Sequence, residues 1–274
     1  MDAARRSALA RFGADRLLIV TCLVLLTLLA WAYLWLLAAR MSQGDMSLMG
    51  MASMPMGAAM PSSAPMPLTW TAATFWLMAL MWWVMMIGMM VPSAMPAILL
   101  HARVQRHHRS DAAQALRLSL SFAAGYLVAW AVFSLIATTA QWGLTEVGQL
   151  APMTMSVGTR LGAVLFGLAG LYQLSPLKSA CLRHCRSPAE FLSTHHRPGW
   201  SGAMVTGFHH GLYCVGCCWL LMALLFAGGV MNLLWVLVIA LFVLVEKLFP
   251  QGGWIARISG ALMLAAAAWL LVLP

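Results

Sequence analysis

The chain has 274 residues, of which 62% are hydrophobic and only 8% are charged, so it lies far outside the composition of soluble globular proteins. Its formal net charge of +9 does not indicate a nucleic-acid partner, because the Lys and Arg residues stand in short stretches between apolar segments. The composition indicates an all-α, polytopic transmembrane helix bundle whose main partner is membrane lipid.

We expect about seven transmembrane spans, each close to the length that a bilayer core requires. They are residues 17–39, 74–100, 118–140, 157–174, 203–227, 231–249 and 254–273. The fifth and sixth are joined only by Gly228-Gly229-Val230, so their status as separate crossings is the least secure part of the count. The chain accordingly divides into three parts: residues 1–40 with a basic N-terminus and an uncleaved signal anchor, a flexible extracytoplasmic loop at 41–73, and a six-helix metal-binding domain at 74–274.

The distribution of basic residues orients these spans. Most of the Arg and Lys residues fall before the first span, between the second and third, between the fourth and fifth, and around the junction of the sixth and seventh. Only Arg40 and Arg160 fall on the opposite side. The positive-inside rule therefore predicts a cytoplasmic N-terminus and an external C-terminus.

The loop after the first span is rich in methionine. It contains Gly, Ser and Pro between its thioethers, which are Met46, Met49, Met51, Met54, Met56 and Met60. Flexible thioethers suit Cu(I) in an oxidising compartment, where thiols tend to oxidise. A disordered linker in which Met is incidental explains the same composition.

Methionines also recur at helical spacing in the second span, where Met85 and Met89 are candidate ligands. Such a stripe is more often packing than a ligand path. It ends, however, at Pro92 and Pro96, where we expect the helix to bend or unwind and to present backbone carbonyls to a cavity.

Two cysteines precede the fifth span in a segment that we expect to be cytoplasmic. Cys181 and Cys185 are separated by three residues, a looser spacing than that of zinc knuckles. In a reducing compartment they are a candidate docking pair for a soft metal. Palmitoylation or a plain interfacial thiol are alternatives.

The fifth span carries the most informative pattern. Four polar or sulfur-bearing residues recur at every fourth position and so share one helical face: His210, Cys214, Cys218 and Met222. Cys217 borders this face. Thiolate, thioether and imidazole together favour Cu(I), followed by zinc or an iron–sulfur centre. The competing interpretation is that Cys and Met fill gaps between helices.

Other polar residues in or near the spans give weaker signals. Glu246 and Lys247 suggest an internal ion pair or an interface anchor, and Tyr126 a packing residue. Cys22 is expected in the core and His101 in a solvated basic loop.

Several of these stretches together resemble a bacterial family described as predicted metal-binding integral membrane proteins of unknown function. The resemblance rests on residues 83–93, on 172–178 with Cys181 and Cys185, on 211–222, and on Glu246-Lys247 with Pro250. It covers the chain from about the second span onward, and it implies metal binding and a multi-pass location in the bacterial inner membrane. It implies no reaction.

These observations favour a membrane protein that handles Cu(I), by acquiring it, relaying it or delivering it to a membrane cuproenzyme. A soluble metallochaperone is another possible partner. One alternative is an enzyme, a membrane thiol–disulfide oxidoreductase that uses the cysteine pairs. Another is a non-catalytic assembly or scaffold subunit. The copper hypothesis does not require catalysis.

Overall fold

The computed structural model describes residues 2–42, 70–108, 111–151, 154–195, 197–249 and 252–272. In these ranges the chain is almost entirely helical and contains no β-strand, as expected for an all-α fold. The helices are α1 (Asp2–Ser42), α2 (Ala72–His108), α3 (Ala112–Glu146), α4 (Thr159–Leu174), α5 (Pro176–Arg186), α6 (Pro188–His195), α7 (Gly199–Ala223), α8 (Leu225–Gly228), α9 (Leu233–Leu248) and α10 (Gly252–Val272). The methionine-rich segment at 43–69 lies outside the described residues.

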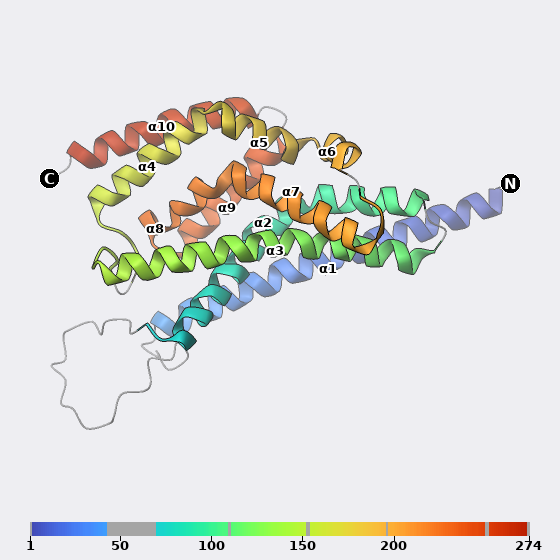
Figure 1. Ribbon diagram of the computed structural model, residues 1–274, viewed down its shortest axis with the longest axis horizontal. Coiled ribbons are helices and arrows are strands. Elements are labelled where there is room, and N and C mark those ends of the chain that lie inside the picture. The colour runs from blue at the N-terminus through green and yellow to red at the C-terminus, as the bar shows by residue number, and fades with distance from the viewer. Residues whose placement is uncertain are drawn as a thin grey trace, which may run out of the picture.

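The helices run back and forth along the long axis of the molecule (Figure 1). Helices α1, α3, α7 and α10 run in one direction, and α2, α4 and α9 return in the other. Helix α3 packs along α7 and α2, and α1 packs along α2. Helices α4 and α10 form a close pair in a second layer, joined to the rest through α7, α8 and α9. The C-terminal end of α2, the start of α3 and the short helix α6 lie toward the N-terminal end (Figure 1).

Five helical segments are long and apolar enough to cross a membrane: Arg16–Arg40, Ala72–Arg106, Ala113–Glu146, Gly199–Gly228 and Gly252–Val272. The fourth and sixth predicted spans are helical, but α4 and α9 have only 16 residues each. At 1.5 Å per residue such a helix is about 24 Å long, shorter than a bilayer core of about 30 Å. The expected count of seven is therefore not confirmed.

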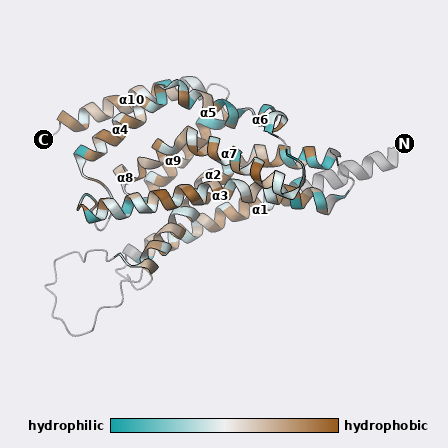
Figure 2. Cartoon of the chain, in the orientation of Figure 1, coloured by the Kyte–Doolittle hydropathy of each residue, from teal (hydrophilic) through white to brown (hydrophobic). Residues whose placement is uncertain are grey.

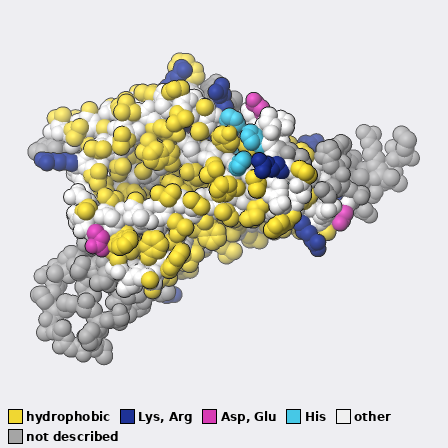
Figure 3. Space-filling view, viewed as in Figure 1, with side chains coloured by type: hydrophobic (Ala, Val, Ile, Leu, Met, Phe, Trp, Pro, Cys, Tyr) yellow, Lys and Arg dark blue, Asp and Glu magenta, His cyan; other side chains and the backbone are white. Residues whose placement is uncertain are grey.

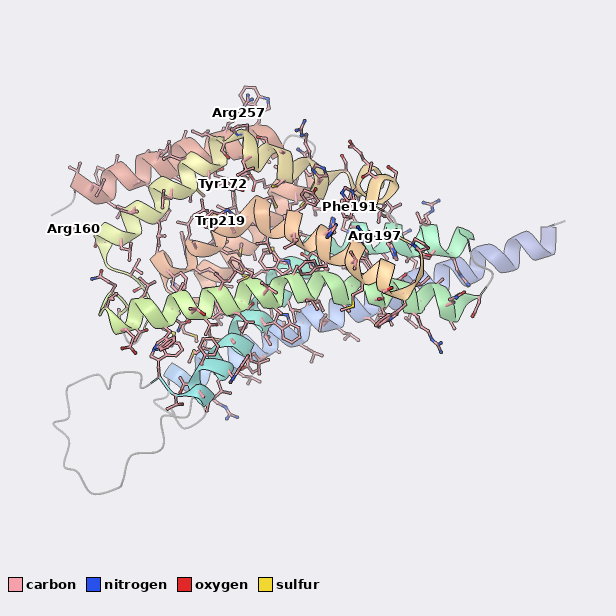
Figure 4. All side chains as sticks on the ribbon, in the orientation of Figure 1. Arg160, Tyr172, Phe191, Arg197, Trp219 and Arg257 are labelled. Carbon is pink, nitrogen blue, oxygen red and sulfur yellow. The ribbon has the colours of Figure 1, made fainter. Side chains whose placement is uncertain are left out.

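The outer surface of the bundle is apolar. Large hydrophobic side chains are exposed on several helices, among them Leu29 on α1, Ile136 on α3, Leu234 on α9 and Leu262 on α10. Figure 2 shows brown helices through the middle of the molecule, and Figure 3 shows an almost continuous hydrophobic face there. Basic side chains such as Arg197 lie toward the N-terminal end, whereas Arg160 lies at the opposite end (Figure 4). We call these the basic end and the opposite end.

Helix α2 continues through both of its prolines to His108, so of the two outcomes predicted from the sequence, a bend or an unwound turn, it does not unwind. Pro92 has no N–H to donate to the carbonyl of Gly88, four residues earlier. Trp31 of α1 supplies that hydrogen bond instead, with its indole Nε1 3.2 Å from Gly88 O. The helix bends rather than breaks, and Figure 1 shows its change of direction.

Small residues let α3 and α7 approach closely. A Cβ atom at Gly207 of α7 would collide with the backbone of Phe122 on α3, and a Cβ at Gly125 would collide with that of Met204. Gly211 is also crowded, with the Cβ of Ala129 2.5 Å from where its own Cβ would stand. This is the small-residue packing that brings apolar helices together without a hydrophobic driving force. It fixes the face of α7 that carries the cysteines.

Candidate metal centre

The predicted ligand face of α7 is buried in the bundle. His210, Cys214, Cys217, Cys218 and Met222 are each at most 3% exposed. The thiols of Cys217 and Cys218 lie 3.1 and 3.0 Å from the carbonyl oxygen of Cys214, to which they donate hydrogen bonds. These side chains therefore turn back along their own helix.

Helix α5 brings two further cysteines against α7. Ser175 caps this helix by accepting a hydrogen bond from the backbone N–H of Lys178, and Pro176 occupies its first turn. Cys185 Sγ lies 3.8 Å from Cys217 Sγ. Cys181 Sγ lies against Gly216, 3.1 Å from where a Cβ would stand. The two cysteines thus face α7, and Cys185 lies within reach of the α7 thiols.

A lysine lies at the centre of the sulfur atoms. Lys247 of α9 has its Nζ 2.9 Å from Cys214 Sγ, 3.9 Å from Cys218 Sγ and 3.9 Å from Met90 Sδ. The residue is only 6% exposed. A buried ammonium is costly unless an anionic or strongly polar partner faces it. Its nearest partner here is the sulfur of Cys214. We refer to Cys185, Cys214, Cys217, Cys218, Met90 and Lys247 as the sulfur cluster.

Glu246 does not pair with its neighbour Lys247, although an internal ion pair between them was one interpretation of the sequence. Lys178 of α5 lies 2.7 Å from its Oε1 and 2.8 Å from its Oε2. Both side chains are almost completely buried. The pair joins α5 to α9 and leaves Lys247 free to face the thiols.

Tyr126 of α3 connects the sulfur cluster to the methionine-rich helix α2. Its hydroxyl lies 3.1 Å from Cys214 Sγ and 3.2 Å from the carbonyl oxygen of Met90. Ser93 extends this network, since its Oγ lies 3.5 Å from Lys247 Nζ. Sequence reasoning assigned Tyr126 to packing, and no pattern in the chain pointed to its hydroxyl.

The remaining predicted ligands are buried near this centre or along α2. The His210 ring lies one turn from Cys214, between Phe122, Tyr126 and Phe191, and its Nδ1 is buried without a hydrogen-bond partner. Met85 and Met89 are also fully buried in the core. The thioether that contacts Lys247 is that of Met90, one step round the helix from the predicted pair.

The α5 thiols are poor nucleophiles. Burial raises the pKa of the Cys181 thiol. Hydrogen bonds with Cys214 and Cys217, together with burial, raise the pKa of Cys185 well above its ordinary value. Tyr172 and Trp219 cover this side of the centre from α4 and α7 with their rings 5.9 Å apart (Figure 4), and the Tyr172 hydroxyl donates to the carbonyl of Gly216.

Two minor expectations are wrong. Cys22 is exposed on the outer face of α1 rather than buried in the core. His101 is buried, with its ring stacked 4.6 Å from that of Phe122 and its Nε2 3.3 Å from Gln105 Nε2. Cys22 therefore serves as a control cysteine outside the sulfur cluster.

A cavity of about 530 Å³ approaches the sulfur cluster from the basic end. Its inner wall includes Pro92 and Leu248, the sequence neighbours of Ser93 and Lys247. Met95 and Leu99 also line it, and three arginines stand around it: Arg16, Arg103 and Arg106.

As the side chains stand, no group of three or more His, Cys, Asp or Glu residues in the described part of the chain is arranged to hold a metal ion. The sulfur atoms are nevertheless close. Two thiolates bound to one ion at about 2.3 Å each lie at most about 4.6 Å apart. The 3.8 Å between Cys185 and Cys217 is within that limit.

The fold and the sulfur cluster define a class: an all-helical protein with membrane-length apolar helices and a buried group of thiols and thioethers. Residues 79–270 match the PpoB2 family, described as copper chaperones, and the chain belongs to that family. The match includes every residue of the sulfur cluster, and it supports a metal-related role. No curated protein and no solved structure matches the chain.

Proposed function

We propose that the chain is an integral membrane copper chaperone that holds Cu(I) at the sulfur cluster and passes it to a partner protein. The observation that carries this proposal is that the sulfur atoms of Cys214, Cys218 and Met90 each lie within 4 Å of a single atom, Lys247 Nζ. A set of thiols and a thioether, without a carboxylate, is the donor set that favours Cu(I). Zinc is the alternative ion, because four cysteine thiolates in a tetrahedron also form a structural zinc site.

Lys247 has a distinct role in this proposal. Two thiolates and one Cu(I) carry a net charge of −1, which is costly in an apolar interior. The ammonium of Lys247 neutralises that charge when it stays beside Cys214, 2.9 Å away. Each further thiol that binds as a thiolate releases a proton. The second thiolate comes from Cys217 or Cys218, which turns from the Cys214 carbonyl to the metal, or from Cys185 of α5.

The proposed location is the bacterial inner membrane, with the basic end in the cytoplasm. The five apolar helices and the position of Arg197 and Arg160 at opposite ends support this orientation. Partners on either side of the membrane, a soluble metallochaperone or a membrane cuproenzyme, would exchange Cu(I) by ligand substitution, without any change in its oxidation state.

The proposal is tested by purifying the protein anaerobically in detergent and measuring bound metals by elemental mass spectrometry. The variant is the triple change of Cys214, Cys217 and Cys218 to Ser, and the matched control is Cys22→Ser. We expect copper in the wild type and the control and its loss from this centre in the triple variant. Unchanged copper binding in the triple variant would overturn the proposal.

One observation favours a second candidate function, thiol–disulfide exchange. Cys185 and Cys217 are close enough that a small shift would join them in a disulfide. The raised pKa of the Cys185 thiol opposes this role, because the thiolate is the reactive form. Mass spectrometry of alkylated protein after mild oxidation distinguishes the two: a trapped Cys185–Cys217 disulfide in copper-free protein supports redox chemistry.

A further inference from the structure

A second group of sulfur atoms lies near the opposite end of the bundle. Gln141 of α3 has its Nε2 3.3 Å from Met155 Sδ and 3.8 Å from Met78 Sδ. Met78 belongs to the second turn of α2, and Met155 lies in the connection between α3 and α4. All three side chains are at most 3% exposed. Segments far apart in the sequence thus bring two thioethers to one nitrogen.

The orientation of the Gln141 amide is set by Trp82. The indole Nε1 of Trp82 is a donor only, and it lies 2.6 Å from Gln141 Oε1. The amide nitrogen must therefore face the two sulfurs. Thioethers are weak hydrogen-bond acceptors, so a buried NH₂ group gains little from them. In this arrangement the lone pairs of both sulfur atoms are directed toward one position, that of Gln141 Nε2.

We propose that Met78 and Met155 form a thioether site for Cu(I), separate from the sulfur cluster. A Cu(I) ion near the position of Gln141 Nε2, with bonds of about 2.3 Å, requires each sulfur to move by roughly 1 to 1.5 Å and the amide to turn aside. The three rotatable bonds of Met permit such a movement. A thioether has no proton to lose, so binding here leaves both the charge of the ligands and the oxidation state of copper unchanged.

A pocket on the outside of the bundle leads to this site. Its volume is about 260 Å³, and Met78 and Met81 line it from α2 while Tyr33, Leu37 and Arg40 line it from α1. The methionine-rich segment 43–69 joins these same two helices in the chain. Such a pocket gives an ion access from the end of the molecule opposite to the basic end.

Buried methionines continue from this site toward the sulfur cluster along α2. Met81, Met85, Met86, Met89 and Met90 are each at most 2% exposed. Met78 and Met90 are separated by twelve residues, or about 18 Å along a helix. The thioether site therefore has the position of an entry site. That role rests on the proposed function, whereas Cu(I) binding at Met78 and Met155 does not.

The test is a titration of anaerobic, detergent-purified protein with Cu(I) against a chromophoric Cu(I) chelator. The variant is Met78→Leu with Met155→Leu, which conserves volume and removes both thioethers. The matched control is Met263→Leu on α10, away from both groups. A second variant with Ser at the six loop methionines accounts for copper bound by segment 43–69. We expect the Met78/Met155 variant to bind one Cu(I) equivalent fewer than the wild type and the Met263 control to bind as many as the wild type.

The same titration in the Cys185/Cys214/Cys217/Cys218→Ser background separates the two centres. We expect that background to retain the thioether equivalent, with an affinity that does not change between pH 6 and pH 8 because no proton is released. The inference is overturned if Met78→Leu with Met155→Leu binds as many equivalents as the wild type. Loss of copper only in the Met variants, with none in the Cys variants, would overturn the proposed function and leave the thioether site standing.

Discussion

The ammonium nitrogen of Lys247 lies 2.9 Å from the sulfur of Cys214, in a part of the core where both side chains are buried. This pair joins α9 to α7. Because Lys178 engages the carboxylate of Glu246, the sulfur of Cys214 is the nearest polar partner that the described contacts give Lys247. The pairing places a positive charge beside a thiol, and the thiolate is the form in which a cysteine binds a metal ion.

Replacement of Lys247 by Met should weaken Cu(I) binding at the sulfur cluster. The variant removes the positive charge that offsets the thiolates, while it conserves most of the side-chain volume. We expect the dissociation constant for Cu(I) to rise at least tenfold, a change of about 1.4 kcal/mol or more. The measurement is competition with a Cu(I) chelator. Arg257→Met, which removes an exposed cation on α10, is the control and should leave the constant unchanged.

The buried pair of Lys178 and Glu246 should matter for stability more than for copper. Glu246→Gln alone leaves a buried ammonium without its counter-charge, and we expect a loss of about 3–5 kcal/mol. Lys178→Met together with Glu246→Leu removes both charges and should recover most of that loss. Thermal unfolding in detergent measures the effect. If the single and double variants unfold at the same temperature, the pair is not coupled as the structure places it.

Close packing of α3 on α7 predicts opposite outcomes for two glycine substitutions. Gly207→Ala places a Cβ against the backbone of Phe122, so the helices must separate. Gly143→Ala meets nothing within 4 Å and should stabilise α3 by up to about 1 kcal/mol through helix propensity. We expect the first variant to unfold at a lower temperature and to lose copper, and the second to do neither. If both glycine variants unfolded at the same temperature and bound the same amount of copper, the close approach of α3 and α7 would be contradicted.

Part of this arrangement was predictable from the sequence. Periodicity placed His210, Cys214 and Cys218 on one face of a helix, and the structure buries that face. The helical segments also lie where apolar stretches predict them, because helices satisfy backbone groups locally. Periodicity reports only which residues share a helix. It carries no information on which helix comes to lie opposite.

The contacts that complete the candidate site are those between helices. Cys185 meets Cys217 only because Ser175 and Pro176 start a new helix that folds back on α7. Lys247 faces Cys214 because Lys178 takes the neighbouring Glu246. Likewise, α2 continues past Pro92 because Trp31 of α1 donates the hydrogen bond that the carbonyl of Gly88 would otherwise lack. Each of these depends on a partner distant in the chain.

The Tyr126 hydroxyl should contribute modestly to the copper centre. Tyr126→Phe removes the bridge between Cys214 Sγ and the carbonyl of Met90, but Lys247 and Ser93 still contact these two groups. The loss of one buried hydrogen-bonding group costs about 1 kcal/mol. We therefore expect a severalfold weaker Cu(I) affinity and an intact fold, measured by chelator competition and thermal unfolding. Tyr33→Phe on α1 is the control.

The cavity at the basic end should control how fast copper leaves the sulfur cluster. Leu99 lines it, and Pro92 and Leu248 form its inner wall beside the cluster. Leu99→Trp fills part of its volume of about 530 Å³ and replaces no residue of the sulfur cluster. We expect unchanged copper stoichiometry and at least a severalfold slower transfer of Cu(I) to an added chelator, followed by stopped-flow absorbance. Leu262→Trp adds the same bulk on the exposed face of α10 and should leave the rate unchanged. An unaltered rate in Leu99→Trp would show that copper leaves the cluster by another route.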